Sequence, residues 1–229
     1  MTTNYTPPVD QYWAALDAAL PGFSPEEQQV AVTLYRELAK GQPVDAEHLG
    51  LALGRSAAEA RALLERDSLK AFAYLDDQGR VSGFGGLTTA RMHHQLELEG
   101  RTLWTWCAWD TLFIPEILGK RGRVTSPDPE IGEAVRLTVT PQEIKSSEPR
   151  HAVVSFLLPD AHEFVSAANL VKTFCHFIFF FASRASGERW VAKHPGTFLY
   201  SLDDAFGLAK RFNARNFGPE LARRQAAAA

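Results

Sequence analysis

The sequence predicts an α+β protein, in which an N-terminal, helical, winged-helix-like module precedes a mixed or antiparallel sheet domain with flanking helices. Amphipathic segments with helix-capping residues fill the N-terminal part. Short runs of alternating apolar or β-branched residues, which favour strands, dominate the remainder. The 229 residues are 45% hydrophobic and suffice to bury a core. We expect an N-terminal extension over residues 1–22, the module over 23–86 and a main domain over 87–229.

Capping signals delimit the first helices. Ser24 with Glu27, and Ser56 with Glu59, have the spacing of a capping box, in which two side chains satisfy free N–H groups at a helix start. Pro and Gly residues are typical of helix ends. The expected helices cover residues 10–20, 24–40, 45–53 and 56–66.

Strands expected at 72–75 and 81–85 complete the order helix, turn, helix, hairpin, which is typical of a winged helix. Many winged helices bind DNA, but residues 43–80 contain five Lys or Arg against seven Asp or Glu. A DNA-binding surface needs a cationic face that displaces counterions from phosphate. We therefore expect this module to cover the main domain and to bind no nucleic acid.

Overall charge and hydropathy predict a cytoplasmic protein. The formal net charge of −3 gives no reason to expect a polyanionic partner. The first residues lack the basic start and apolar segment of a targeting peptide. The longest apolar run, residues 177–182, is far too short to cross a bilayer, so no membrane association is expected.

The main domain alternates between expected strands and helices. Gly83, Gly85 and Gly86 form a hinge into it, and His93 and His94 are interpreted as surface or hydrogen-bonded side chains. The expected strands cover 92–98, 124–126, 135–140, 151–158, an aromatic strand at 175–183, and 198–200. A short helix is expected around Cys107, limited by Pro115 and Gly119. Three further helices are expected over residues 163–172, 186–194 and 201–217.

Two apolar segments hold the only two cysteines, Cys107 and Cys175. On a helix, residues three apart share a face, so Asp110 is expected to point into the same space as Cys107. A buried cysteine often acts only as a small hydrophobic side chain. Two thiols and a carboxylate in aromatic surroundings instead favour chemistry on a soft, apolar, thiol-seeking compound.

The segments around both cysteines resemble the catalytic segments of the organomercurial (alkylmercury) lyases. The likeness covers about residues 28–217. It is carried by the run 106–115 (WCAWDTLFIP), by Phe174-Cys175-His176 with 180–183 (FFAS), and by Trp190, Lys193-His194, 204–208 (DAFGL) and Phe212-Asn213. Some relatives carry a further cysteine beside the second thiol, where this sequence has His176.

The resemblance implies that Cys107 and Cys175 bind mercury and that Asp110 handles the proton in a catalytic domain over 87–229. The reaction would give a hydrocarbon and Hg(II) held between two sulfurs, without an organic cofactor. Burial among Trp104, Trp106 and Trp109 is expected to raise the carboxyl pKa. Small thiols or a mercuric reductase would accept the metal.

Two other classes remain open at this point. A mercury- or soft-metal-responsive winged-helix regulator, or a metal-binding protein, would use both thiols without catalysis. A cysteine hydrolase would use Cys107 as nucleophile with His151, His176 or His194 as base. The sequence also leaves open the choice between alkyl and aryl substrates, the oligomeric state and the role of the N-terminal extension.

Overall fold

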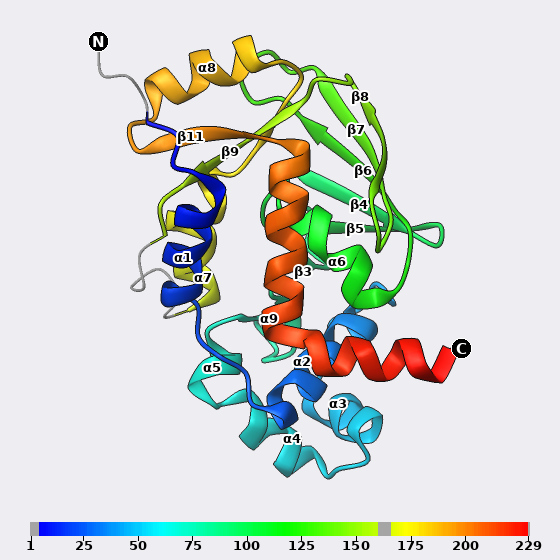
Figure 1. The fold of residues 1–229 in the computed structure, drawn as a ribbon. Helices are drawn as coiled ribbons and strands as arrows, with labels where there is room; N and C mark the ends of the chain where they lie inside the picture. The colour runs from blue at the N-terminus through cyan, green and yellow to red at the C-terminus, as the bar shows by residue number, and fades with distance from the viewer. Residues whose placement is uncertain (1–4, 160–165, 229) are drawn as a thin grey trace.

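The computed structural model describes residues 5–159 and 166–228, which form two antiparallel sheets and surrounding helices (Figure 1). The larger sheet has the strand order β1-β2-β3-β5-β4-β6-β7-β8, and the smaller has the order β10-β9-β11. The larger sheet consists of β1 (Ala73–Leu75), β2 (Val81–Phe84), β3 (Leu87–Thr88), β4 (His94–Leu98), β5 (Arg101–Thr105), β6 (Gly122–Pro127), β7 (Ala134–Val139) and β8 (Ile144–Glu148). The smaller consists of β9 (Val153–Leu157), β10 (Phe180–Phe181) and β11 (Thr197–Ser201). The predicted α+β class with an antiparallel sheet is confirmed.

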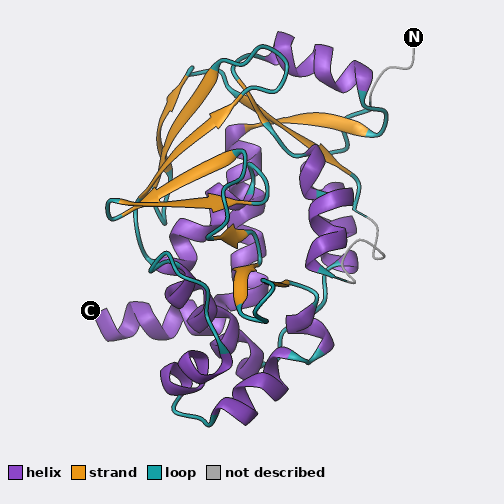
Figure 2. Cartoon of the chain, turned by 180° about the vertical axis from the view of Figure 1, so that it is seen from behind, coloured by secondary structure: helices purple, strands orange, loops and turns teal. Residues whose placement is uncertain are grey.

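The helices of residues 25–64 gather at one end of the molecule, below the main sheet strands (Figure 2). They begin where the capping residues predict. Ser24 and Ser56 each form a complete capping box with the glutamate three residues later, and Gly54 ends its helix in the left-handed conformation. After α1 (Val9–Ala19) come α2 (Pro25–Leu38), α3 (Ala46–Leu53), α4 (Ala57–Leu64) and α5 (Asp67–Lys70).

The β1–β2 hairpin is continuous with the large sheet. β2 pairs with β3, and β3 pairs in turn with β5, which leads to the first cysteine. An isolated bridge between Val44 and Val81 joins the start of α3 to the same hairpin. The elements of residues 23–86 therefore lead directly, through hydrogen-bonded strands, to the segment that carries Cys107.

Helix α9 (Leu202–Ala228) runs past both sheets and packs against α6 (Asp110–Leu118) and α2 (Figure 1). Asn213 joins α9 to α6 by donating hydrogen bonds to the Phe113 carbonyl (2.9 Å) and to Glu116 (2.7 Å). The helix extends to Ala228, so the predicted end near residue 217 is wrong. It changes direction in its last part (Figure 1) and contains Pro219, whose ring bends the helix without ending it.

Helices α7 (Ala167–Thr173) and α8 (Arg184–Lys193) complete the structure. The predicted start of α7 at residue 163 lies outside the described residues. The edge strand β8 was not predicted, because its sequence, Ile-Lys-Ser-Ser-Glu, is mostly polar and exposed and shows no apolar alternation. Among the described residues, no helix is both long enough and apolar enough to span a membrane.

Both cysteine segments differ from the predicted secondary structure. Cys107 lies in the turn between β5 and α6, because the helix begins only at Asp110. Cys175 begins a short 3-10 helix (Cys175–Phe177), and only Phe180–Phe181 of the predicted aromatic strand pairs in a sheet. Apolar side chains alone do not distinguish a strand from an irregular buried segment.

Candidate active site

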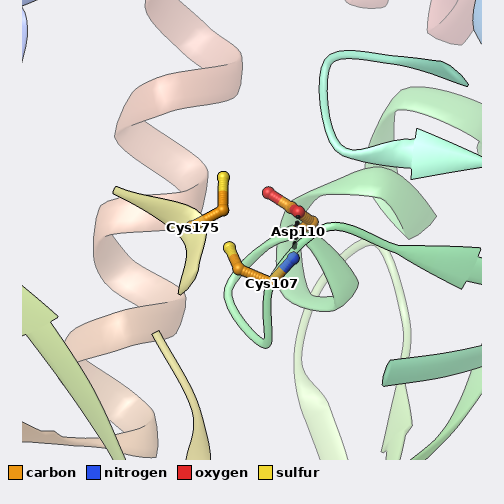
Figure 3. A group of neighbouring side chains, drawn as sticks. All are labelled: Cys107, Asp110 and Cys175. Carbon is orange, nitrogen blue, oxygen red and sulfur yellow. Dashed lines mark hydrogen bonds between the residues drawn. The ribbon is translucent and has the colours of Figure 1, made fainter. Parts of the chain in front are cut away.

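Cys107, Asp110 and Cys175 lie together, although Cys175 is far along the chain from the other two (Figure 3). One ligand atom of each residue, the two sulfurs and a carboxylate oxygen, lies within 4.8 Å of the others. All three side chains are buried, with exposed fractions of 1%, 5% and 4% respectively. The site is therefore a compact, buried group of two thiols and one carboxyl group.

The turn that carries Cys107 is held by hydrogen bonds from three sides. The Thr105 hydroxyl donates to the Cys107 carbonyl at 2.8 Å. The Trp106 backbone N–H donates to the Gly86 carbonyl at 2.9 Å, and the Ala108 N–H donates to the Ile178 carbonyl at 3.1 Å. The last bond joins the first cysteine segment to the second and brings the two sulfurs to the same place.

The segment after Cys175 is held by Ser155 of β9. The Ser155 hydroxyl donates to the Phe177 carbonyl at 2.7 Å and accepts from the Phe179 N–H at 3.0 Å. The Ser155 N–H donates to the Phe179 carbonyl at 3.0 Å. These bonds to Ser155 take the place of part of a regular strand ladder, so the backbone groups of Phe177 and Phe179 have partners outside a strand.

Asp110 is the first residue of α6, and its Oδ2 accepts a hydrogen bond of 2.7 Å from the Cys107 N–H. In this i to i+3 contact, the carboxylate at the first residue of α6 satisfies an N–H of the turn that precedes the helix. Cys107 and Asp110 therefore lie close together, as expected. They do so because Cys107 lies in the turn before the helix, and not because both residues share a helical face.

Burial dominates the electrostatics of this site. It raises the pKa of the Asp110 carboxyl from its ordinary value to about 7, although hydrogen bonds from Cys107 and Trp106 act to lower it. Burial also raises the pKa of the Cys107 thiol well above its ordinary value, and contact with Cys175 and the charge of Asp110 add to this rise. At neutral pH the Cys107 thiol is therefore protonated, and the Asp110 carboxyl is present in both its acid and its ionised form.

A small cavity of about 40 Å³ adjoins the three groups. Its walls come from the N-terminal helix, the Gly85-Gly86 turn, both cysteine segments and α9. The lining residues are Leu16, Leu20, Phe72, Gly85, Gly86, Trp106, Cys107, Trp109, Asp110, Phe113, Leu170, Phe174, Cys175 and Phe212. Trp104, expected among them, is not a lining residue: it lies on β5, where successive side chains point to opposite faces, and its ring lies under Arg91.

No histidine is among the cavity-lining residues of the described chain. His151 and His176 are exposed, and His194 stacks on Trp190 with ring centroids 3.8 Å apart. None of the three histidines considered as the base of a hydrolytic Cys107 therefore lines this cavity. His94 is buried and hydrogen-bonded to the Ser126 hydroxyl at 2.7 Å, as its interpretation as a hydrogen-bonded side chain predicted.

Comparisons with known proteins agree with these observations. The family model of the alkylmercury lyases (MerB) matches residues 87–213. An alkylmercury lyase from Pseudomonas putida is 40% identical over 188 residues, which cover 82% of this chain and 84% of that protein. The chain belongs to the alkylmercury lyase family. An alkylmercury lyase from Streptomyces lividans is 38% identical over 177 residues, covering 77% of this lyase and 78% of that protein.

The fold comparison extends beyond the matched domain. A crystal structure of the mercury-bound form of MerB2 covers 89% of this lyase and 96% of its own chain, with a TM-score of 0.71 and 21% identity. At this identity the likeness concerns the fold. The function predicted from the sequence, a lyase that cleaves carbon–mercury bonds, is confirmed by the family match and the curated relatives.

Sequence reasoning missed part of the cavity wall. Leu170 belongs to a helix with no motif, and Leu16 and Leu20 lie in the segment expected only as a helix over residues 10–20. Gly85 and Gly86 were interpreted as a hinge between two domains. The adjacency of these two glycines was the available signal for a site role, because glycine pairs also occur where the backbone closely approaches another group.

Proposed function

We propose that this lyase cleaves the carbon–mercury bond by protonolysis, with Cys107 and Cys175 as mercury ligands and Asp110 as proton carrier. One observation supports the proposal most strongly: two sulfurs and a carboxylate oxygen lie within 4.8 Å of one another in a buried site. Thiolate is the softest donor that a protein offers, and an alkylmercury cation is a soft acid.

The first step is the capture of an alkylmercury cation. The S–H bond of a thiol breaks, a sulfur–mercury bond forms, and the proton needs an acceptor. The Cys107 pKa lies above its ordinary value, so this thiol does not ionise by itself at neutral pH. Asp110, with a pKa of about 7, is partly ionised there and accepts the proton as the metal arrives.

The second step transfers a proton to carbon. The second thiol loses its proton, which is the free proton of the overall reaction, and its sulfur bonds to mercury. This coordination increases the electron density on mercury and weakens its bond to carbon. The protonated Asp110 then donates its proton, and the electron pair of the carbon–mercury bond forms the new carbon–hydrogen bond. In total, one alkylmercury cation and two thiols yield one hydrocarbon, one mercury(II) ion held by two thiolates, and one free proton.

The chain's own side chains supply every group in this scheme, so we propose that no organic cofactor takes part. Both product bonds to mercury are sulfur bonds, so release requires competing thiols. We infer that small thiols or a mercuric reductase accept the metal by thiolate exchange. A reducing compartment keeps Cys107 and Cys175 as thiols, which supports a cytoplasmic location.

We further propose that residues 23–86 are a winged-helix-like module that covers the catalytic part and binds no nucleic acid. The excess of acidic residues over 43–80 supports this role, because phosphate contacts require cationic side chains. A mobility-shift assay with duplex DNA is the test. Salt-sensitive binding at micromolar protein would contradict the proposal and favour a regulator.

The central test is Asp110→Ala. We expect this variant to bind mercury(II) through both thiols but to release methane from methylmercury, with excess thiol present, at least about 10²-fold more slowly than the wild type. Asp203→Ala is the matched control, because Asp203 is an exposed aspartate at the start of α9. Methane release by Asp110→Ala at near the wild-type rate would mean that another group supplies the proton.

A further inference from the structure

Gly86 lies against the carboxyl group of Asp110. A Cβ atom placed on Gly86 would lie 2.4 Å from the Asp110 Cγ and 2.7 Å from its Oδ1, closer than a side chain can approach. Gly86 also has a φ of +96°, a backbone conformation that L side chains rarely adopt. The missing side chain of Gly86 therefore provides the space that the carboxyl group occupies.

The Gly85-Gly86 turn is held by hydrogen bonds from three separate segments. The Gly85 N–H donates to the Phe72 carbonyl at 3.0 Å, and the Gly86 carbonyl accepts from the Trp106 N–H at 2.9 Å. The Tyr35 hydroxyl donates to the Gly85 carbonyl at 2.6 Å. The turn thus has a defined place relative to the segment that carries Cys107.

Tyr35 brings the N-terminal module into this arrangement. It belongs to α2, is buried, and its ring packs edge-on against Phe84 and Phe217, with centroids 5.5 Å and 6.0 Å away. A Cβ on Gly85 would lie 2.2 Å from the Tyr35 oxygen, so a larger residue at position 85 would displace the Tyr35 hydroxyl. Burial, with a further contribution from the charge of Asp110, raises the pKa of Tyr35, so this hydroxyl remains a donor.

We propose that Gly86 and Tyr35 are positioning residues for the reaction: the Gly85-Gly86 turn, held by the Tyr35 hydroxyl, forms the wall that keeps the Asp110 carboxyl directed at the mercury-bound carbon. The inference rests on the proposed role of Asp110. The Cys107 N–H holds one carboxylate oxygen and Gly86 lies against the other, so the group has little freedom to turn away. A displacement of about 1 Å in such a group can cost about 10²-fold in rate.

The first test is Gly86→Ala in the full chain. We expect its kcat for methane release to fall at least about 10-fold, because the new methyl group displaces the carboxyl. The stoichiometry and tightness of mercury(II) binding by the two thiols are expected to be unchanged. Gly41→Ala is the matched control: Gly41 has a φ of +86° and no atom within 4 Å of a new Cβ. The Gly41→Ala variant has the same type of backbone strain but no contact with the site. Its kcat is therefore expected to stay within about 2-fold of the wild type.

A double-mutant cycle separates positioning from a general structural role. If Gly86 acts through Asp110, Gly86→Ala has no further effect on the residual rate once Asp110→Ala is present. Removal of the carboxyl group relieves only part of the loss in melting temperature, because the new Cβ would still lie 2.8 Å from the Cβ at position 110 and the φ of +96° remains unfavourable for alanine. Additive losses of rate and melting temperature in the double variant would overturn the proposal. So would a Gly86→Ala kcat equal to that of Gly41→Ala.

Tyr35→Phe provides a second test, which decides if Gly86→Ala does not fold. It removes only the hydroxyl and keeps the ring packing. We expect kcat to fall about 3- to 10-fold, with KM and mercury(II) binding unchanged and no effect in the Asp110→Ala background. Tyr74→Phe, at an exposed tyrosine of β1, is the control. A wild-type kcat in Tyr35→Phe would overturn the role of Tyr35. Full activity of Asp110→Ala, by contrast, would remove the proposed proton carrier itself.

Discussion

The backbone N–H of Cys107 donates a hydrogen bond of 2.7 Å to Oδ2 of Asp110, three residues later (Figure 3). This contact holds the Asp110 carboxyl group beside the first thiol. It also fixes one oxygen of a carboxyl group whose pKa burial raises to about 7. The relationship between these two residues supports separate predictions about metal capture, stability and access.

Metal capture is expected to depend on both thiols equally. Replacing either sulfur by oxygen exchanges a soft donor for a hard one, which binds mercury weakly. Cys107→Ser and Cys175→Ser are therefore expected to lose tight mercury(II) binding together with methane release, measured by titration against a competing thiol. Asp110→Ala is the control, because it leaves both sulfurs in place. Tight capture by either serine variant would contradict a two-thiolate site.

The raised pKa of Asp110 predicts how stability depends on pH. The folded state binds the carboxyl proton more tightly than the unfolded state, whose pKa is near 3.8. This contribution is fully present below about pH 4 and is lost as the pH rises through about 7. The shift corresponds to on the order of 4 kcal/mol in the free energy of unfolding.

Urea unfolding at several pH values checks this sign. The free energy of unfolding of the wild type, minus that of Asp110→Asn, is expected to decrease between pH 5 and pH 8. The subtraction removes the titration of other groups, such as buried His94, whose pKa is lowered to about 3. A difference that stays constant, or increases, over this range would show that the carboxyl is not held in its acid form by burial.

Arg215 is expected to keep the N-terminal helix over the cavity. Its guanidinium donates to the backbone carbonyls of Asp17 (3.1 Å), Leu20 (3.0 Å) and Pro21 (3.1 Å), and it pairs with the Asp17 carboxylate. These are carbonyls at and after the end of α1, which have no partner within the helix. Because Leu20 lines the cavity, this contact also limits access to the thiols.

We predict that Arg215→Ala lowers the free energy of unfolding by about 1–3 kcal/mol, as loss of bonds to a charged donor does. It is also expected to increase the rate at which a maleimide modifies the two thiols. The control is Arg211→Ala, which removes an ion pair with the exposed Asp10 and should cost less than about 1 kcal/mol. Modification of Arg215→Ala at the wild-type rate would show that α1 does not limit access.

The sequence by itself determined the helix ends of this lyase that depend on interactions within a few residues. Capping boxes at Ser24 and Ser56 and the left-handed Gly54 and Gly119 mark the observed helix ends, because these signals act within one turn of the chain. The identities of the two thiols and the carboxylate, and with them the soft-metal chemistry, could also be inferred from residue types and their likeness to a family.

Only the tertiary structure decided how these groups meet. The strand expected after Cys175 is replaced by a segment that Ser155 holds, and the bond from Ala108 to Ile178 joins two segments far apart in sequence. The space for the Asp110 carboxyl comes from Gly86, whose role depends on a neighbour that the sequence does not place beside it. Residue type and short spacing determine which chemistry a chain carries, whereas contacts between distant segments depend on how the whole core packs.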